Sequence, residues 1–109
     1  MSEYTVLTYT ENGRDIFGDW FAELRDLKGK DEIRRTLRKI SQGNLGNTRY
    51  CREGVWEIKI DVSAGYRVYY SQSGKKIILL LCGGSKRTQK SDIDRAVNYL
   101  KKFKEEHKW

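Results

Sequence analysis

The sequence predicts an α+β protein with the element order β-α-α-β-β-β-β-α and a mainly antiparallel, curved sheet. In two segments before residue 43, apolar residues recur at helical spacing, and from about residue 49 they alternate with polar residues. Short connections separate the later segments, and such hairpins join antiparallel neighbours because parallel strands need long crossovers. The 109 residues are enough for one hydrophobic core, so we expect a single domain over 1–109.

The N-terminal part predicts a strand followed by two helices. Residues 3–9, EYTVLTY, are rich in β-branched and aromatic side chains. A first helix is expected from about 14 to 28, and a second after the break at 28–30, ending at Gly43. Their apolar stripes consist of Ile16, Phe17, Trp20, Phe21, Leu24 and Leu27, and of Ile33, Leu37 and Ile40.

The central part predicts strands at 55–61 (VWEIKID) and 66–70 (YRVYY), joined by a hairpin. Alternation places one set of large side chains on a common inner face: Trp56, Ile58, Ile60, Tyr66, Val68 and Tyr70. The following run at 76–82, KIILLLC, is apolar on both faces and is therefore expected to be a central strand covered on two sides.

The C-terminal part predicts one more helix. Ser91 followed by Asp94 fits a capping box, and Gly83-Gly84 is expected to form the turn before it. The buried stripe of this helix would be Ile93, Ala96, Val97, Leu100 and Phe103. We expect the two N-terminal helices on one face of the sheet and this helix to pack from elsewhere.

The hairpin also predicts a candidate site. With Ile60 opposite Tyr66, the outer face would carry four residues together, Glu57, Lys59, Arg67 and Tyr69. Like charges across a strand pair are unfavourable, so Lys59 and Arg67 need either Glu57 as a partner or a bound anion. An ordinary solvated, salt-bridged sheet face is the alternative.

A cationic segment follows the central strand and is expected at the rim of the same face. It contains Lys86, Arg87, Gln89 and Lys90. Two glycines, three cations and a helix N-terminus in one segment are typical of phosphate binding.

The charge distribution points to a polyanionic partner. Residues 1–27 carry a net charge of −4, from six acids and two bases, and residues 28–109 carry +11, from twenty bases and nine acids. Nucleic acid is the simplest polyanion for such a surface, and a merely soluble basic surface is the alternative.

Other features of the sequence exclude several classes of protein. Cys51 and Cys82 lack CxxC spacing and nearby histidines, so we expect reduced thiols, no metal and no cofactor. No segment approaches the roughly 20 apolar residues of a membrane span, and the N-terminus does not resemble a signal peptide. A cytoplasmic protein without membrane association is expected.

Metal-free RNA cleavage remains compatible with these residues, because the 2′-hydroxyl of RNA can itself be the nucleophile. The reaction needs a base, an acid for the leaving 5′-oxygen and cations for the charge on the phosphate. Arg67 suits the last role because it is permanently charged and bidentate. Proton transfer would fall to Glu57 or to a lysine among neighbouring cations, for which Lys59 and Lys86 are candidates.

The sequence resembles the RelE/ParE toxin superfamily, and within it the phage-associated killer proteins grouped with HigB-type toxins. The resemblance lies in FGDWFAELRD, RRTLRKISQGNLGNTR, GVWEIKIDVSAGYRVYY and LLLCGGSKRTQKSDIDRA. It implies a RelE-like fold and the toxin of a type II toxin–antitoxin module. Such toxins cut messenger RNA without a metal, usually in the ribosomal A site, and are neutralised by a helix-turn-helix antitoxin from the adjacent gene.

The resemblance also implies roles for residues. Arg67 matches the phosphate-stabilising arginine, Lys59 matches a frequent active-site lysine, and Lys86 lies in the segment that carries another catalytic cation. Many relatives have a tyrosine or histidine near the start of the last helix, where this chain has Asp92 and Ile93. The residues expected to bind RNA are Arg49, Tyr69, Arg87, Gln89 and Lys90.

Two other functions remain open from the sequence. ParE relatives with the same fold poison DNA gyrase, and they would depend less on Arg67. The segment GGSKRTQKSDIDRAVNYL also looks like the last helix of double-stranded RNA-binding domains, which predicts a non-catalytic RNA-binding module.

Overall fold

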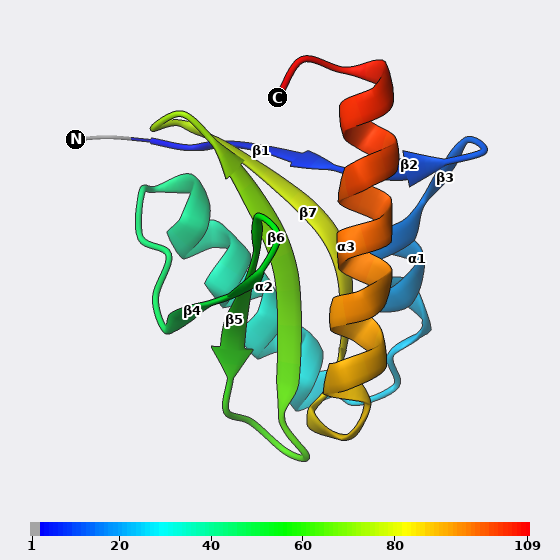
Figure 1. Cartoon of the computed structure of the whole chain (residues 1–109). Coiled ribbons are helices and arrows are strands. Elements are labelled where there is room, and N and C mark those ends of the chain that lie inside the picture. Colours follow the sequence, from blue (N-terminus) through cyan, green and yellow to red (C-terminus); the bar gives the residue numbers. More distant parts are fainter. Residues whose placement is uncertain (1–2) are drawn as a thin grey trace.

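A computed structural model describes residues 3–109, and its architecture is α+β as predicted (Figure 1). The elements are β1 (Thr5–Thr8), β2 (Thr10–Glu11), β3 (Arg14–Asp15), α1 (Ile16–Glu23), α2 (Leu27–Ser41), β4 (Thr48–Arg52), β5 (Val55–Ile60), β6 (Tyr66–Ser73), β7 (Ile77–Ser85), the 3₁₀ turn η1 (Lys86–Thr88) and α3 (Gln89–Glu106). None of the helices within residues 3–109 has the length and apolar character needed to cross a membrane.

The main sheet has five strands in the order β1-β7-β6-β5-β4. All neighbouring pairs are antiparallel except β1 and β7, which are parallel, and β2 and β3 form a separate ribbon. The predicted β5–β6 register is confirmed: Ile60 pairs with Tyr66, Lys59 with Arg67, and Glu57 with Tyr69. Register fixes which side chains share a face, so this pairing positions the candidate site.

Helices cover both faces of the sheet (Figure 1). α1 and α2 contribute to one core with Ile78 and Leu80 of β7, and α3 contributes to a second core with Leu79 and Leu81. β7 is thus the central, doubly covered strand that its apolar sequence predicted. Each fully buried leucine contributes about 1.5–3 kcal/mol through removal of apolar surface from water.

The predicted boundary between the first two helices was wrong. α1 ends at Glu23, and 28–30, predicted as the break, lies inside α2. A glycine is needed at position 29, because a Cβ there would lie 2.6 Å from the Tyr66 ring. Tyr66 also donates a hydrogen bond to Asp26, at 2.8 Å, just before α2. A tertiary contact with β6 therefore explains a glycine that locally looks like a helix breaker.

The start of the first helix also differs from the prediction. Residues 14 and 15 belong to β3, and α1 begins after them. The Asp15 carboxylate accepts a hydrogen bond from the Gly18 amide at 2.9 Å, which caps α1 at its N-terminus.

Gly83 and Gly84 do not form the predicted turn, because β7 continues through them to Ser85. A Cβ on Gly83 would lie 2.4 Å from the Trp20 ring, and a Cβ on Gly84 would lie 1.7 Å from Asp92 Oδ2. Both glycines thus allow close packing of α1 and α3 against β7, on opposite faces of the strand.

The predicted capping box at Ser91 was also wrong, since α3 already begins at Gln89 with Thr88 at the cap position. The Ser91 hydroxyl instead donates to the Thr88 carbonyl at 3.1 Å. The η1 turn immediately before α3 absorbs the change of direction that the sequence assigned to the glycines.

Candidate active site

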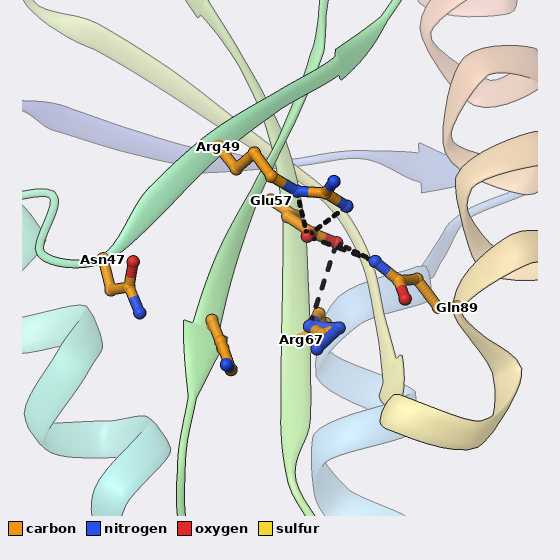
Figure 2. A pocket seen from close by; sticks show the side chains of 6 residues that line it. Asn47, Arg49, Glu57, Arg67 and Gln89 are labelled. Carbon is orange, nitrogen blue, oxygen red and sulfur yellow. Dashed lines mark hydrogen bonds and ion pairs between the residues drawn. The ribbon is translucent and has the colours of Figure 1, made fainter.

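One pocket of about 460 Å³ lies over β4, β5 and β6, beside the start of α3 (Figure 2). We call it the Arg67 pocket, and it is lined by Asn47, Arg49, Glu57, Lys59, Arg67 and Gln89. Pairing of β5 with both neighbouring strands positions four of these side chains, because Arg49 lies opposite Glu57 and Arg67 opposite Lys59. Cross-strand pairing thus gathers residues that are far apart in the sequence.

The Glu57 carboxylate is the shared acceptor of the polar contacts in the pocket. It is only 3% exposed, and its Oε1 accepts a hydrogen bond from Arg49 Nε at 2.8 Å. Arg49 Nη2 forms an ion pair with the same oxygen at 2.7 Å. Gln89 Nε2 lies 3.2 and 3.1 Å from the two carboxylate oxygens. Hydrogen bonding to Glu57, together with its negative charge, raises the pKa of Arg49. One buried carboxylate therefore joins the edge strand β4, the strand β5 and the start of α3.

Arg67 is buried, with few partners. It is 7% exposed, and its Nε lies 3.9 Å from Glu57 Oε2, which is too long for a hydrogen bond. Its Nε and Nη1 are buried without a hydrogen-bond partner among residues 3–109. Leaving a buried donor unsatisfied costs about 1–3 kcal/mol, and more for a charged group. Part of the hydrogen-bonding capacity of this guanidinium, at the wall of the pocket, is therefore unused by the described residues.

Lys59 adds a second cation next to Arg67. Its side chain is 46% exposed, and its nearest acidic partner is Asp61, at 3.8 Å. Because Lys59 and Arg67 are directly paired across the strands, their like charges repel. With Arg49, the pocket contains three cations and one carboxylate, an arrangement that favours a bound anion.

Tyr69 does not lie on an open surface as the sequence analysis expected. It is fully buried in the core beneath α3, although it is paired with Glu57 as predicted. Its hydroxyl has no hydrogen-bond partner among the described residues. Burial is the main cause that raises the pKa of Tyr69, followed by the negative charges of Glu57 and Asp92. A direct contact of this ring with RNA is incompatible with its position.

The residues of the predicted cationic segment do not all lie at the Arg67 pocket. Lys86 and Arg87 lie exposed on η1 and do not line the Arg67 pocket. The Lys86 amide donates to the Gly65 carbonyl at 3.2 Å, which fixes this turn against the tip of the β5–β6 hairpin. Lys90 lines an adjoining hollow that shares Arg49 with the pocket. The structure therefore brings Glu57, Lys59, Arg67, Arg49 and Gln89 together, and leaves Lys86 and Arg87 outside.

Asn47 is the one lining residue that the sequence analysis did not name. It precedes β4, and its carbonyl accepts a hydrogen bond from the Lys59 amide at 2.9 Å. Extending the β4–β5 pairing by one residue beyond Thr48 and Ile58 would have indicated it. The pattern of the sequence alone does not fix that pairing, because residues 43–48 have no clear periodicity.

The lining residues do not form a metal-ligand set. Three of the six side chains are cations, and Glu57 already accepts hydrogen bonds from Arg49 and Gln89. Within residues 3–109, no group of three or more His, Cys, Asp or Glu side chains is arranged to hold a metal ion. Cys51 and Cys82 are unpaired thiols.

Comparison with known proteins relates this chain to a phage-derived family. Residues 19–101 match the family described as phage derived protein Gp49-like (DUF891), and this range includes every residue that lines the Arg67 pocket. An uncharacterized protein of Haemophilus influenzae is 36% identical over 80 residues, which cover 73% of this chain and 81% of that protein.

Proposed function

The chain belongs to the Gp49-like family of phage-derived proteins, and on this premise we propose that it is the toxin of a type II toxin–antitoxin module. Family membership is consistent with a toxin of this general kind. We further propose that it inhibits translation as a metal-independent, ribosome-dependent endoribonuclease acting on messenger RNA. The observation that carries this proposal is Arg67, a buried guanidinium with unsatisfied donors at the base of a cationic pocket.

The pocket supports a phosphodiester as its ligand. A phosphate oxygen can accept the hydrogen bonds that Arg67 lacks, and a guanidinium binds phosphate bidentately. Arg49 on β4 and Lys59 on β5 add positive charge. In the transition state the phosphate gains charge, so preorganised cations stabilise it more than they stabilise the substrate.

In the proposed reaction, the RNA 2′-oxygen attacks the adjacent phosphorus and the bond to the 5′-oxygen breaks. The 2′-hydroxyl proton passes to a base, and an acid protonates the departing 5′-oxygen, which yields a 2′,3′-cyclic phosphate and a 5′-hydroxyl. Lys59 is the pocket group whose position favours contact with the reacting oxygens, since it is half exposed and only loosely paired. Glu57 serves mainly to hold Arg49 and Gln89, to which it is already hydrogen-bonded.

Induction of the wild-type gene is expected to arrest growth and to create new mRNA 5′ ends at translated sites, detected by primer extension. Arg67→Ala should abolish both effects, and Arg67→Lys should retain part of them because the charge remains. The matched control is Lys75→Ala, an exposed cation that does not line the Arg67 pocket. Growth arrest without new 5′ ends would contradict the nuclease and favour a different target such as DNA gyrase.

We also expect an antitoxin with a helix-turn-helix domain, encoded by the adjacent gene, to neutralise the protein. The cationic pocket supports this expectation, because an acidic partner segment that covers it would exclude RNA. Co-expression of the adjacent gene should restore growth. Protection of Lys59 from acetylation in the resulting complex would place the partner at the pocket.

A further inference from the structure

The two oxygens of the Glu57 carboxylate have different partners. Oε1 lies 2.8 Å from Arg49 Nε and 2.7 Å from Arg49 Nη2, so this oxygen carries the ion pair with β4. The hydrogen bond that Oε2 accepts among residues 3–109 comes from Gln89 Nε2, at 3.1 Å. Arg67 Nε lies 3.9 Å from Oε2 and makes no hydrogen bond within the same residues. Gln89 thus holds the oxygen that is nearest to Arg67.

Glu57 and Arg67 would close into an ion pair if nothing else held the carboxylate. Their side chains are 4% and 9% exposed, and buried charges are screened little by solvent and salt. Because N–H···O bonds are usually about 2.9 Å long, a shift of about 1 Å at Oε2 would close the gap. The closed pair would satisfy Arg67 Nε and neutralise the charge that an anion binds. A competing donor on Oε2 therefore explains why the gap stays open.

Gln89 is suited to this competition, because its neutral amide gives Glu57 a hydrogen bond and leaves the charge of the pocket unchanged. Gln89 is the first residue of α3 and is preceded by Thr88. The Thr88 hydroxyl donates to the buried Asp92 carboxylate, which also accepts from Arg95 Nη2 at 2.9 Å. Asp92 in turn packs closely against Gly84 of β7. The backbone that carries Gln89 is therefore anchored to the sheet.

We propose that Gln89 is a positioning residue, which holds the Glu57 carboxylate away from Arg67 and so keeps the guanidinium free for a phosphate (Figure 2). This role differs from the RNA contact expected from the sequence, because the amide nitrogen is already engaged by Glu57. Such preorganisation lowers stability, since the buried donors of Arg67 stay unsatisfied without a ligand. This inference rests on the proposed function for the identity of the anion, an RNA phosphate.

The first test is the affinity of the full chain for sulfate, which is used as a phosphate-like probe. The affinity is obtained from urea unfolding at increasing sulfate and constant ionic strength, with Arg67→Met as the variant that lacks the site. Gln89→Met, which keeps the length of the side chain and removes the donor, should weaken sulfate binding about tenfold. The matched control is Gln42→Met, the same substitution at an exposed residue outside the Arg67 pocket, which should leave the affinity unchanged.

The second test separates positioning from a general loosening of α3. In the wild-type background, Gln89→Met should raise the equilibrium constant for unfolding less than about threefold, because Arg67 Nε replaces the lost donor to Oε2. In the Arg67→Met background this replacement is missing, and the same substitution should raise the constant about tenfold or more. A double-mutant cycle from urea unfolding measures the difference. A purely structural role of Gln89 predicts equal effects in both backgrounds.

The outcomes distinguish the positioning role from the nuclease. Weaker sulfate binding by Gln89→Met, together with the expected coupling to position 67, would support the positioning role even if the protein does not cleave mRNA. Unchanged sulfate affinity, or equal unfolding effects in both backgrounds, would overturn it even in a protein that cleaves mRNA. Absence of sulfate binding by the wild type would overturn both.

Discussion

Replacing Arg67 by methionine is expected to make the protein more stable and inactive. Methionine has a similar length and no polar hydrogen, so it can fill the space without unsatisfied donors. Two guanidinium nitrogens are buried without partners, and each unmade hydrogen bond costs about 1–3 kcal/mol. Repulsion from Lys59 across the strand pair, about 0.2–1 kcal/mol, is removed as well.

The opposing contribution is the attraction between Arg67 and Glu57. Their 3.9 Å separation is too long for a hydrogen bond, and Glu57 keeps Arg49 at 2.7 Å and Gln89 at 3.1 Å. The carboxylate is therefore not left as an isolated buried charge, which is the usual reason why breaking a buried pair is costly. We expect the free energy of unfolding to rise by about 1–3 kcal/mol.

Urea unfolding monitored by tryptophan fluorescence measures this change. Trp20 and Trp56 pack against one core and Trp109 against the other, so the signal reports on both faces of the sheet. Lys59→Met is the matched control, expected to lie within about 0.5 kcal/mol of the wild type because Lys59 is half exposed. Sulfate at ten times its dissociation constant should stabilise the wild type by about 1.4 kcal/mol and leave Arg67→Met unchanged. Destabilisation of Arg67→Met by more than 1 kcal/mol would refute the view of Arg67 as an unsatisfied cation.

Three further substitutions test the structure. Glu57→Gln should lower the free energy of unfolding by about 2 kcal/mol or more in the same urea assay, because buried positive charge loses its counter-ion; unchanged stability would contradict its role as the shared acceptor. Gly84→Ala should cost about 1–3 kcal/mol through overpacking against Asp92, and neutral behaviour would contradict the close α3–β7 packing. Burial raises the pKa of the Cys82 thiol from 9.0 to about 12. The Cys82 thiol therefore ionises at lower pH in the unfolded chain than in the folded protein, and the free energy of unfolding falls as pH rises from about 9 to 12. Cys82→Ala should make that decline less steep. In the native protein, thiol reagents should modify Cys51 before Cys82.

The strands around the site were predictable because their signals are local. The β5–β6 connection is short, and a register that keeps both apolar sets on one face excludes a shift by one residue. The register chosen on that ground is the observed one, with Lys59 opposite Arg67. The residues before Gly83 are apolar on both faces of the strand. This likewise indicates a central strand, because only a strand covered on both faces buries all its side chains.

The remaining features depend on contacts between distant segments. Periodicity shows that Tyr69 faces away from the first core, but it does not show that α3 covers that second face. Gly29 looks like a breaker in the sequence, because the Tyr66 ring that requires it lies far along the chain. Gly84 looks like one because its contact, the Asp92 carboxylate, reaches it only when α3 packs back onto β7. The parallel pairing of β1 with β7 also joins segments about seventy residues apart, which no local pattern specifies.

The hydrogen bonds between Gln89 and Glu57 have a consequence for synthesis of the chain. The pocket needs side chains from Asn47 to Gln89, and β1 can pair only after β7 has been made. An N-terminal fragment that stops before Gln89 therefore lacks both the last ligand of the Glu57 carboxylate and the α3 helix that buries Tyr69. Whatever the pocket binds, the chain cannot bind it there until the segment that completes the pocket has been translated.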